Sequence, residues 1–145
     1  MAEFPTRRMR RLRSEGFRDI VEETNVTAND IVAPLFVDAN LDEKSEIPSM
    51  PGQYRHPVEE IGVRAGELRD LGIPAVILFG VPESKDEQGT RAWAEDGVVQ
   101  RATRRINNSV DDLLVITDLC MCEYTEHGHC GVLNDEGEVD NDATL

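Results

Sequence analysis

Residues 57–79, PVEEIGVRAGELRDLGIPAVILF, combine two patterns that decide the fold class. Pro57 suits the first position of a helix, and apolar residues then recur at intervals of three or four until Gly72. These apolar residues are Val58, Ile61, Ala65 and Leu68. Ala75 to Phe79 follow as a short apolar run, which is typical of a strand buried on both faces. The segment therefore predicts a helix that leads directly into a strand.

Similar elements are predicted on both sides of this segment. Ile31 to Val37 (IVAPLFV) predict an earlier strand, although Pro34 removes one hydrogen-bond donor from it. Gly97 to Asn107 predict a second amphipathic helix, and Leu113 to Ile116 predict a third strand. Strands that alternate with helices pair in parallel through right-handed crossovers, so we expect an α/β fold.

Two architectures fit this order, an open doubly wound sheet and a closed TIM (β/α)8 barrel. No glycine-rich dinucleotide fingerprint follows any predicted strand. A barrel takes about 250 residues, so this chain of 145 residues would form its amino-terminal portion. We expect residues 1–30 to form an extended arm with a short helix near Phe17 to Thr24. Residues 31–145 would hold the first three strands and two helices of an incomplete barrel, with the polar segment from Asp38 to Pro57 as a long loop.

The charge of the chain excludes several classes of partner. Fifteen Lys and Arg residues against twenty-nine Asp and Glu residues give a net charge of −14, which repels nucleic acid and anionic lipid. No apolar run approaches the roughly 20 residues that span a bilayer, and the arginine-rich start lacks the apolar stretch of a signal peptide. We therefore expect a cytoplasmic protein without nucleic-acid or membrane partners. The acidic excess fits a halophilic source and an ordinary acidic cytoplasmic protein equally well.

All three cysteines, Cys120, Cys122 and Cys130, lie in one polar loop after the third predicted strand. The carboxyl ends of barrel strands are where active-site residues gather. Thiolates favour zinc, and three protein ligands leave a fourth position for water or substrate, as in catalytic zinc sites. His127 or His129 could equally supply a fourth ligand and close a structural site. A buried, metal-free role for the cysteines fits such a polar loop poorly.

This loop resembles the metal loop of the porphobilinogen synthases, also called 5-aminolevulinate dehydratases. In that family a strand ends in an aspartate and is followed by C-x-C-x7-C, with Glu-Tyr and His-Gly-His-Cys-Gly between and around the cysteines, and residues 118–131 match throughout. Further matches are Arg10 to Arg13 (RRLR), Met50-Pro51-Gly52, Trp93, Glu95-Asp96-Gly97 and the closing VDNDATL at 139–145. The resemblance covers essentially the whole chain.

The resemblance implies a lyase that condenses two 5-aminolevulinate molecules to porphobilinogen, with loss of water, in tetrapyrrole (heme) biosynthesis. Cys120, Cys122 and Cys130 match the zinc ligands of the zinc-dependent branch. Asp118 matches a pocket aspartate that assists proton transfer or orients an active-site lysine. In the family the metal helps to bind one substrate and makes its amine a better nucleophile.

The family's covalent chemistry belongs to two lysines on later strands, which form Schiff bases with the substrates. Lys44 and Lys85 are the only lysines here, and neither matches those motifs. We therefore expect the 145-residue chain alone to be inactive. The resemblance also implies a homo-oligomer, commonly an octamer, in which the arginine-rich arm (Arg7 to Arg13) wraps a neighbouring subunit.

Two other functions remain open from the sequence. One is a small zinc-stabilised binding module without catalysis. The other is a zinc hydrolase on the same barrel, with Glu123 or Glu126 as general base toward metal-bound water. Strand-borne lysines encoded beyond Leu145 would favour the synthase.

Overall fold

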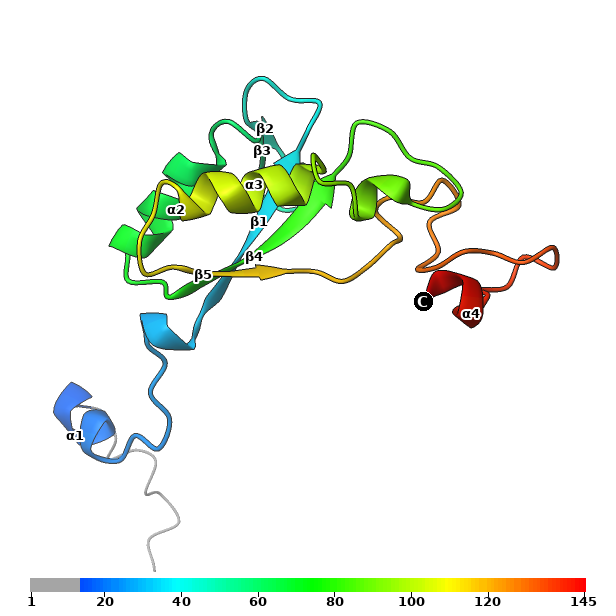
Figure 1. Ribbon diagram of the computed structural model, residues 1–145. Helices are drawn as coiled ribbons and strands as arrows, with labels where there is room; N and C mark the ends of the chain where they lie inside the picture. The colour runs from blue at the N-terminus through cyan, green and yellow to red at the C-terminus, as the bar shows by residue number, and fades with distance from the viewer. Residues whose placement is uncertain (1–13) are drawn as a thin grey trace, which may run out of the picture.

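A computed structural model describes residues 14–145 (Figure 1). Its α-helices are α1 (Glu15–Ile20), α2 (Ile61–Asp70), α3 (Val98–Asn107) and α4 (Asn141–Thr144), and its 3-10 turns are η2 (Ala28–Asp30) and η3 (Thr90–Ala92). Its strands are β1 (Val32–Asp38), β2 (Ser45–Glu46), β3 (Tyr54–His56), β4 (Ala75–Val81) and β5 (Leu114–Thr117). The arginine-rich arm at residues 7–13 lies outside the described residues.

The strands form a single five-stranded sheet in the order β2-β3-β1-β4-β5. Strands β1, β4 and β5 are neighbours and run parallel, with Pro34 opposite Ile77 and Ile77 opposite Ile116. Helix α2 connects β1 to β4, and helix α3 connects β4 to β5. The α/β fold with a parallel sheet, expected from the three apolar runs, is therefore confirmed.

The long loop expected between Asp38 and Pro57 contains two strands that the sequence did not reveal. Strand β3 pairs in parallel with the end of β1, and β2 pairs antiparallel with β3. Between them, Ile47 N–H donates to the Gln53 carbonyl oxygen at 2.9 Å and closes the turn. Strands of two and three residues are too short to show a periodic pattern.

The first and second helices begin at different residues from those expected. Helix α1 covers Glu15–Ile20 rather than Phe17 to Thr24, and none of its residues is buried. Helix α2 begins at Ile61 rather than Pro57, because residues 57–60 form a turn in which Glu60 N–H donates to the Pro57 carbonyl oxygen at 3.2 Å. Since α1 buries nothing, its ends are not fixed by packing.

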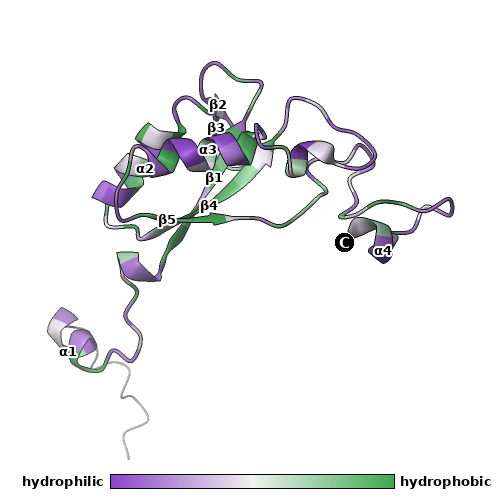
Figure 2. Cartoon of the chain, in the orientation of Figure 1, coloured by the Kyte–Doolittle hydropathy of each residue, from purple (hydrophilic) through white to green (hydrophobic). Residues whose placement is uncertain are grey.

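Helices α2 and α3 cover one face of the sheet, and the hydrophobic core lies between them and the strands (Figure 1). Alternate residues of a strand point to opposite faces, so every second strand residue enters this core. The core strand residues are Leu35, Val37, Val76 and Leu78, and the helix residues packed on them are Ile61, Ala65, Leu68, Val98, Ala102 and Ile106. In Figure 2 the long strands are coloured mostly as hydrophobic, whereas the helices carry both hydrophobic and hydrophilic residues.

The opposite face of the sheet is apolar but has no helix over it among residues 14–145. Phe36 and Phe79 stack there with ring centroids 5.6 Å apart, and both remain partly exposed. Pro34 and Ile77 lie beside them in the same register. In a TIM barrel this face points into the barrel interior, where side chains from all eight strands pack together.

Among the described helices, none is both long enough and apolar enough to cross a bilayer.

Candidate metal centre

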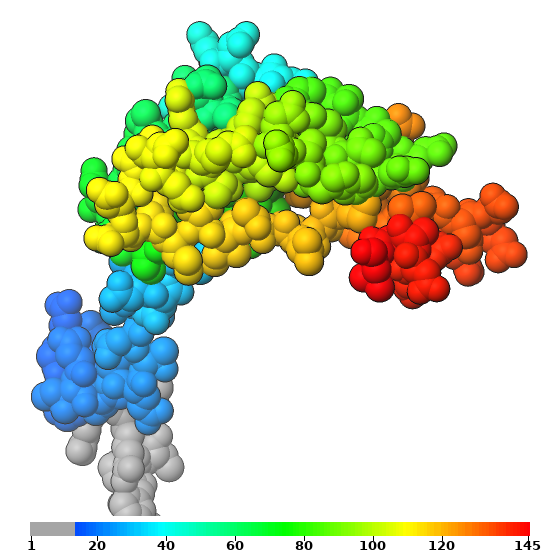
Figure 3. Space-filling view, in the orientation of Figure 1, coloured from blue at the N-terminus to red at the C-terminus, as the bar shows by residue number. Residues whose placement is uncertain are grey.

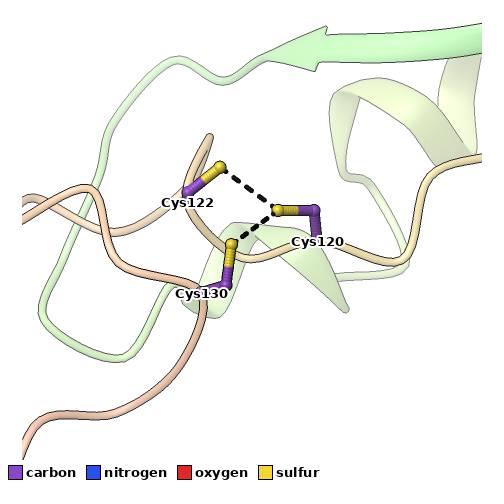
Figure 4. A group of neighbouring side chains, drawn as sticks. All are labelled: Cys120, Cys122 and Cys130. Atoms are coloured by element: carbon purple, nitrogen blue, oxygen red, sulfur yellow. Dashed lines mark hydrogen bonds between the residues drawn. The ribbon is translucent and has the colours of Figure 1, made fainter. Parts of the chain in front are cut away.

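The cysteine loop, residues 118–131, begins where β5 ends at Thr117. It brings the three cysteine side chains together, with Cys120 Sγ 3.2 Å from Cys122 Sγ and 2.9 Å from Cys130 Sγ. All three sulfur atoms lie within 4.8 Å of one another. Figure 4 shows them pointing toward a common centre. Within residues 14–145 this is the only group of three or more potential metal-ligating side chains at such distances.

The spacing of the sulfur atoms fits a single zinc ion. Tetrahedral zinc with bonds of about 2.3 Å places its sulfur ligands about 3.8 Å apart. The observed contacts of 2.9 and 3.2 Å are shorter, so modest side-chain rotations would open room for the ion. Three soft ligands of this kind favour zinc over magnesium or calcium.

The thiols perturb one another's ionisation. The pKa of Cys122 is raised to about 12, first by its contact with the Cys120 thiol and then by burial. The pKa of Cys130 is lowered, first by its contact with Cys120 and then by the backbone N–H of Cys122. The thiolate of Cys130 is therefore stabilised, whereas the Cys122 thiol retains its proton. Binding of a metal ion to Cys122 would displace that proton.

Neither histidine of the loop belongs to the sulfur group. His127 Nε2 lies 3.1 Å from the Glu87 carbonyl oxygen, and His127 Nδ1 accepts the backbone N–H of His129 at 3.2 Å. A carbonyl oxygen only accepts hydrogen bonds, so Nε2 carries the proton and both ring nitrogens are engaged. This arrangement gives no support to a closed site with His127 as fourth ligand.

Asp118 lies at the carboxyl end of β5, beside the sulfur atoms. It lines a groove of about 850 Å³ together with Cys120 and Cys130. Burial raises the pKa of Glu123, the nearby Asp118 carboxylate raises it further, and Lys85 opposes both. Asp118, Glu123 and Lys85 are thus close enough to interact.

The two lysines lie at different places relative to this groove. Lys85 is in the β4–α3 loop (residues 82–97), and its ammonium group acts electrostatically on Glu123. The Nζ of Lys44 lies 5.2 Å from the centre of the Tyr54 ring. Neither Lys44 nor Lys85 lines the groove. Lys44 directly precedes the short strand β2 and Lys85 lies in the loop after β4, so neither lysine is the residue that ends a parallel strand.

The β4–α3 loop supports the cysteine loop, a role that sequence reasoning missed. Asp86 pairs with Thr125 as an isolated parallel bridge, in which Asp86 N–H donates to the Tyr124 carbonyl oxygen at 3.3 Å. In the same bridge, the N–H of Glu126 donates to the Asp86 carbonyl oxygen at 3.1 Å. The Asp86 carboxylate also accepts the backbone N–H and the hydroxyl of Thr90. An Asp followed at short range by Gly89 and Thr90 is a turn signal that could have been noticed in the sequence.

Comparison with known proteins identifies the family. The sequence profile of the delta-aminolevulinic acid dehydratases matches residues 6–145. The chain belongs to this family. The expected resemblance to porphobilinogen synthases is thereby confirmed.

Individual dehydratases match over essentially the whole chain. The enzyme of Archaeoglobus fulgidus is 46% identical over 145 residues, which are 100% of this chain and 45% of the relative. The enzyme of Synechocystis sp. is 50% identical over 146 residues, which cover 98% of this chain and 45% of the relative. The chain therefore spans less than half the length of these relatives.

A solved dehydratase structure agrees with the fold. The enzyme of Toxoplasma gondii, crystallised with the reaction product porphobilinogen, superposes with a TM-score of 0.87 at 31% sequence identity. The match covers 99% of this chain and 41% of the dehydratase chain. The expectation that the chain forms the amino-terminal portion of the barrel is confirmed.

Proposed function

We propose that the full-length protein containing this chain is a porphobilinogen synthase, which condenses two 5-aminolevulinate molecules to porphobilinogen with loss of water. The observation that carries this proposal is the convergence of three cysteine sulfur atoms beside Asp118, at the carboxyl end of a parallel strand. Membership of the dehydratase family favours this function over a zinc hydrolase or a non-catalytic binding module. The Schiff-base lysines expected for the family would come from strands outside the 145 residues.

Zinc is the metal that the site fits best, with Cys120, Cys122 and Cys130 as its ligands. When bound, zinc would supply Lewis acidity and favour the unprotonated form of a substrate amine. The exposed Asp118 carboxylate shares the groove with Cys120 and Cys130. From there it can accept a proton from a bound substrate or hold a cationic group in place. The Cys130 side chain is exposed, so a substrate can reach this side of the sulfur group.

Removal of the metal from the full-length protein tests this function. We expect chelation to lower the rate of porphobilinogen formation at least about 100-fold, since Lewis-acid stabilisation contributes several kcal/mol. Added zinc should restore the rate, whereas magnesium should not, because three thiolates are poor ligands for a hard cation. Product formation from 5-aminolevulinate is the measurement. A rate that survives complete removal of zinc would contradict the proposed site.

We also propose that copies of the protein assemble through the amino-terminal arm. Among the described residues, helix α1 stands clear of the sheet and of the helices that cover it (Figure 3). Within it, Phe17 is 52% exposed and Ile20 is 84% exposed, although both are apolar. Exposed apolar side chains on a helix that is not covered by any other described part of the chain favour contact with another subunit.

Replacing Ile20 with glutamate should weaken this assembly. Burial of an isoleucine contributes about 1.5–3 kcal/mol, and an unpaired carboxylate in its place would add a desolvation cost. We expect the Ile20→Glu variant of the full-length protein to shift toward smaller species in sedimentation-velocity experiments. Asp19→Asn, on the same exposed helix, removes a charge without changing the apolar surface and serves as control. An unchanged size distribution for Ile20→Glu would argue against the arm as the contact.

A further inference from the structure

Thr125 is a completely buried polar residue in the middle of the cysteine loop, with 0% of its surface exposed. Its hydroxyl donates to the His129 carbonyl oxygen at 2.8 Å. The backbone N–H of Gly128 donates to the Thr125 carbonyl oxygen at 3.3 Å. Together these bonds close the turn that carries the chain from Cys122 back to Cys130. Gly128 makes the turn possible, because its φ of +74° is readily adopted only by glycine.

Thr125 is also fixed from outside the cysteine loop. Its backbone neighbours pair with Asp86, and a side chain at Gly89 would place its Cβ only 3.2 Å from the Thr125 methyl group. The β4–α3 loop is itself braced internally by Arg91, which pairs with Asp96 at 2.9 Å and with Glu83 at 3.2 Å. Thr125 therefore connects the β4–α3 loop, on one side, with the turn from Cys122 to Cys130 that its hydroxyl closes, on the other.

Cys130 depends on this turn more than the other two cysteines do. Its side chain is exposed, whereas those of Cys120 and Cys122 are partly buried. The Cys130 sulfur contacts Cys120 Sγ and the backbone N–H of Cys122 from its exposed position, so the backbone conformation at Cys130 must bring the sulfur to these partners. The His129 carbonyl belongs to the peptide unit that joins His129 to Cys130, and the Thr125 hydroxyl fixes that unit directly.

We propose that the Thr125 hydroxyl is a positioning group that holds Cys130 beside Cys120 and Cys122, so that three sulfur ligands are available to one metal ion. This inference rests on the proposed metal site. Without the hydroxyl, the His129 carbonyl loses its hydrogen bond and the turn can open. The third sulfur would then be placed less often at the metal. Removal of a group that orients a metal ligand in this way typically lowers metal affinity 10- to 100-fold.

The test compares two substitutions of Thr125 in the full-length protein. Thr125→Val keeps the shape of the side chain and removes the hydroxyl, whereas Thr125→Ser keeps the hydroxyl and removes the methyl group. Zinc affinity is measured by competition with a chromophoric chelator, and thermal unfolding of the metal-free forms is measured alongside it. We expect Thr125→Val to bind zinc about 10- to 100-fold more weakly, and Thr125→Ser to remain within about threefold of the parent protein.

Thr103→Val is the matched control. The Thr103 hydroxyl is buried but has no hydrogen-bond partner among the described residues, so its removal should leave zinc affinity unchanged. If Thr125→Val fails to fold, Thr125→Ala in the same assay takes its place, with the same expected loss. Zinc saturation should restore porphobilinogen formation in the folded variants.

The possible outcomes separate this inference from the proposed function. If the parent protein binds zinc and Thr125→Val binds it equally well, the positioning role is wrong while the metal site stands. If Thr125→Ser loses as much affinity as Thr125→Val, side-chain shape rather than the hydroxyl positions Cys130, and the inference is again wrong. If the parent protein binds no zinc at the cysteines, the proposed metal site fails, and this inference fails with it.

Discussion

Replacing Cys120 with serine is expected to abolish zinc binding by the cysteine group and to lower porphobilinogen formation by the full-length protein about 100-fold or more. Cys120 is the member of the group that contacts both others, at 3.2 Å from Cys122 and 2.9 Å from Cys130. A serine hydroxyl is not ionised at neutral pH and is a harder ligand than a thiolate. Its introduction would leave two effective ligands where three are needed.

Two measurements distinguish loss of the ligand from loss of the fold. Metal analysis after dialysis should give one zinc per subunit less than in the parent protein. Thermal unfolding of the metal-free forms should change little, because serine is close to cysteine in size and Cys120 is only partly buried. Full zinc content together with unchanged product formation in Cys120→Ser would show that Cys120 is not a ligand.

Replacing Gly80 with alanine is expected to destabilise the protein by about 1–3 kcal/mol, the usual cost of overpacking a core. Gly80 lies on β4, facing helix α3 and the cysteine loop. An added Cβ would lie 2.7 Å from Val99 Cγ2 and 2.8 Å from both Val98 Cγ1 and Tyr124 Oη. Since Tyr124 is only 5% exposed, it has little room to move away. Its displacement would disturb the neighbouring part of the cysteine loop, which includes Cys122.

Gly66→Ala provides the matched control for this substitution. Gly66 lies inside helix α2, and a Cβ there would meet only Val110 Cγ2 at an ordinary 3.8 Å. Alanine is favoured over glycine within a helix by about 0.5–1 kcal/mol, so this variant should be as stable as the parent protein or more so. Urea unfolding of the metal-free proteins measures both changes. Equal stability of Gly80→Ala and Gly66→Ala would show that the contact with Tyr124 is not tight.

The sequence predicts the large elements of this fold because hydrophobic periodicity reports burial. The runs at residues 31–37 and 75–79 became β1 and β4, which lie at the centre of the parallel sheet. Strands β2 and β3 could not be predicted in the same way. They are held by pairing with residues of β1 and by a local turn, and neither contact leaves a periodic pattern.

The clustering of the three cysteines could be predicted from the sequence, but the residues that support their loop could not. The close spacing of Cys120, Cys122 and Cys130 indicated convergence, and the structure shows it. The pairing of Asp86 with Thr125 joins residues 39 positions apart in the sequence. Such a contact depends on the packing of two loops, which local residue patterns do not encode. The zinc ligands, the role of Asp118, the cytoplasmic location and the halophilic source all remain predictions.

The apolar sheet face around Phe36 and Phe79 affects how the protein folds while it is being translated. The other face acquires its cover from α2 and α3, which are close in sequence, so it can form soon after residue 117 leaves the ribosome. The Phe36 face gains no such cover from residues 14–145, so on the nascent polypeptide it would stay exposed to water until other residues cover it. During that interval this face is an exposed apolar surface, which is prone to aggregation and is the kind of surface that chaperones bind. A slow translation step soon after this segment would therefore favour aggregation over correct folding.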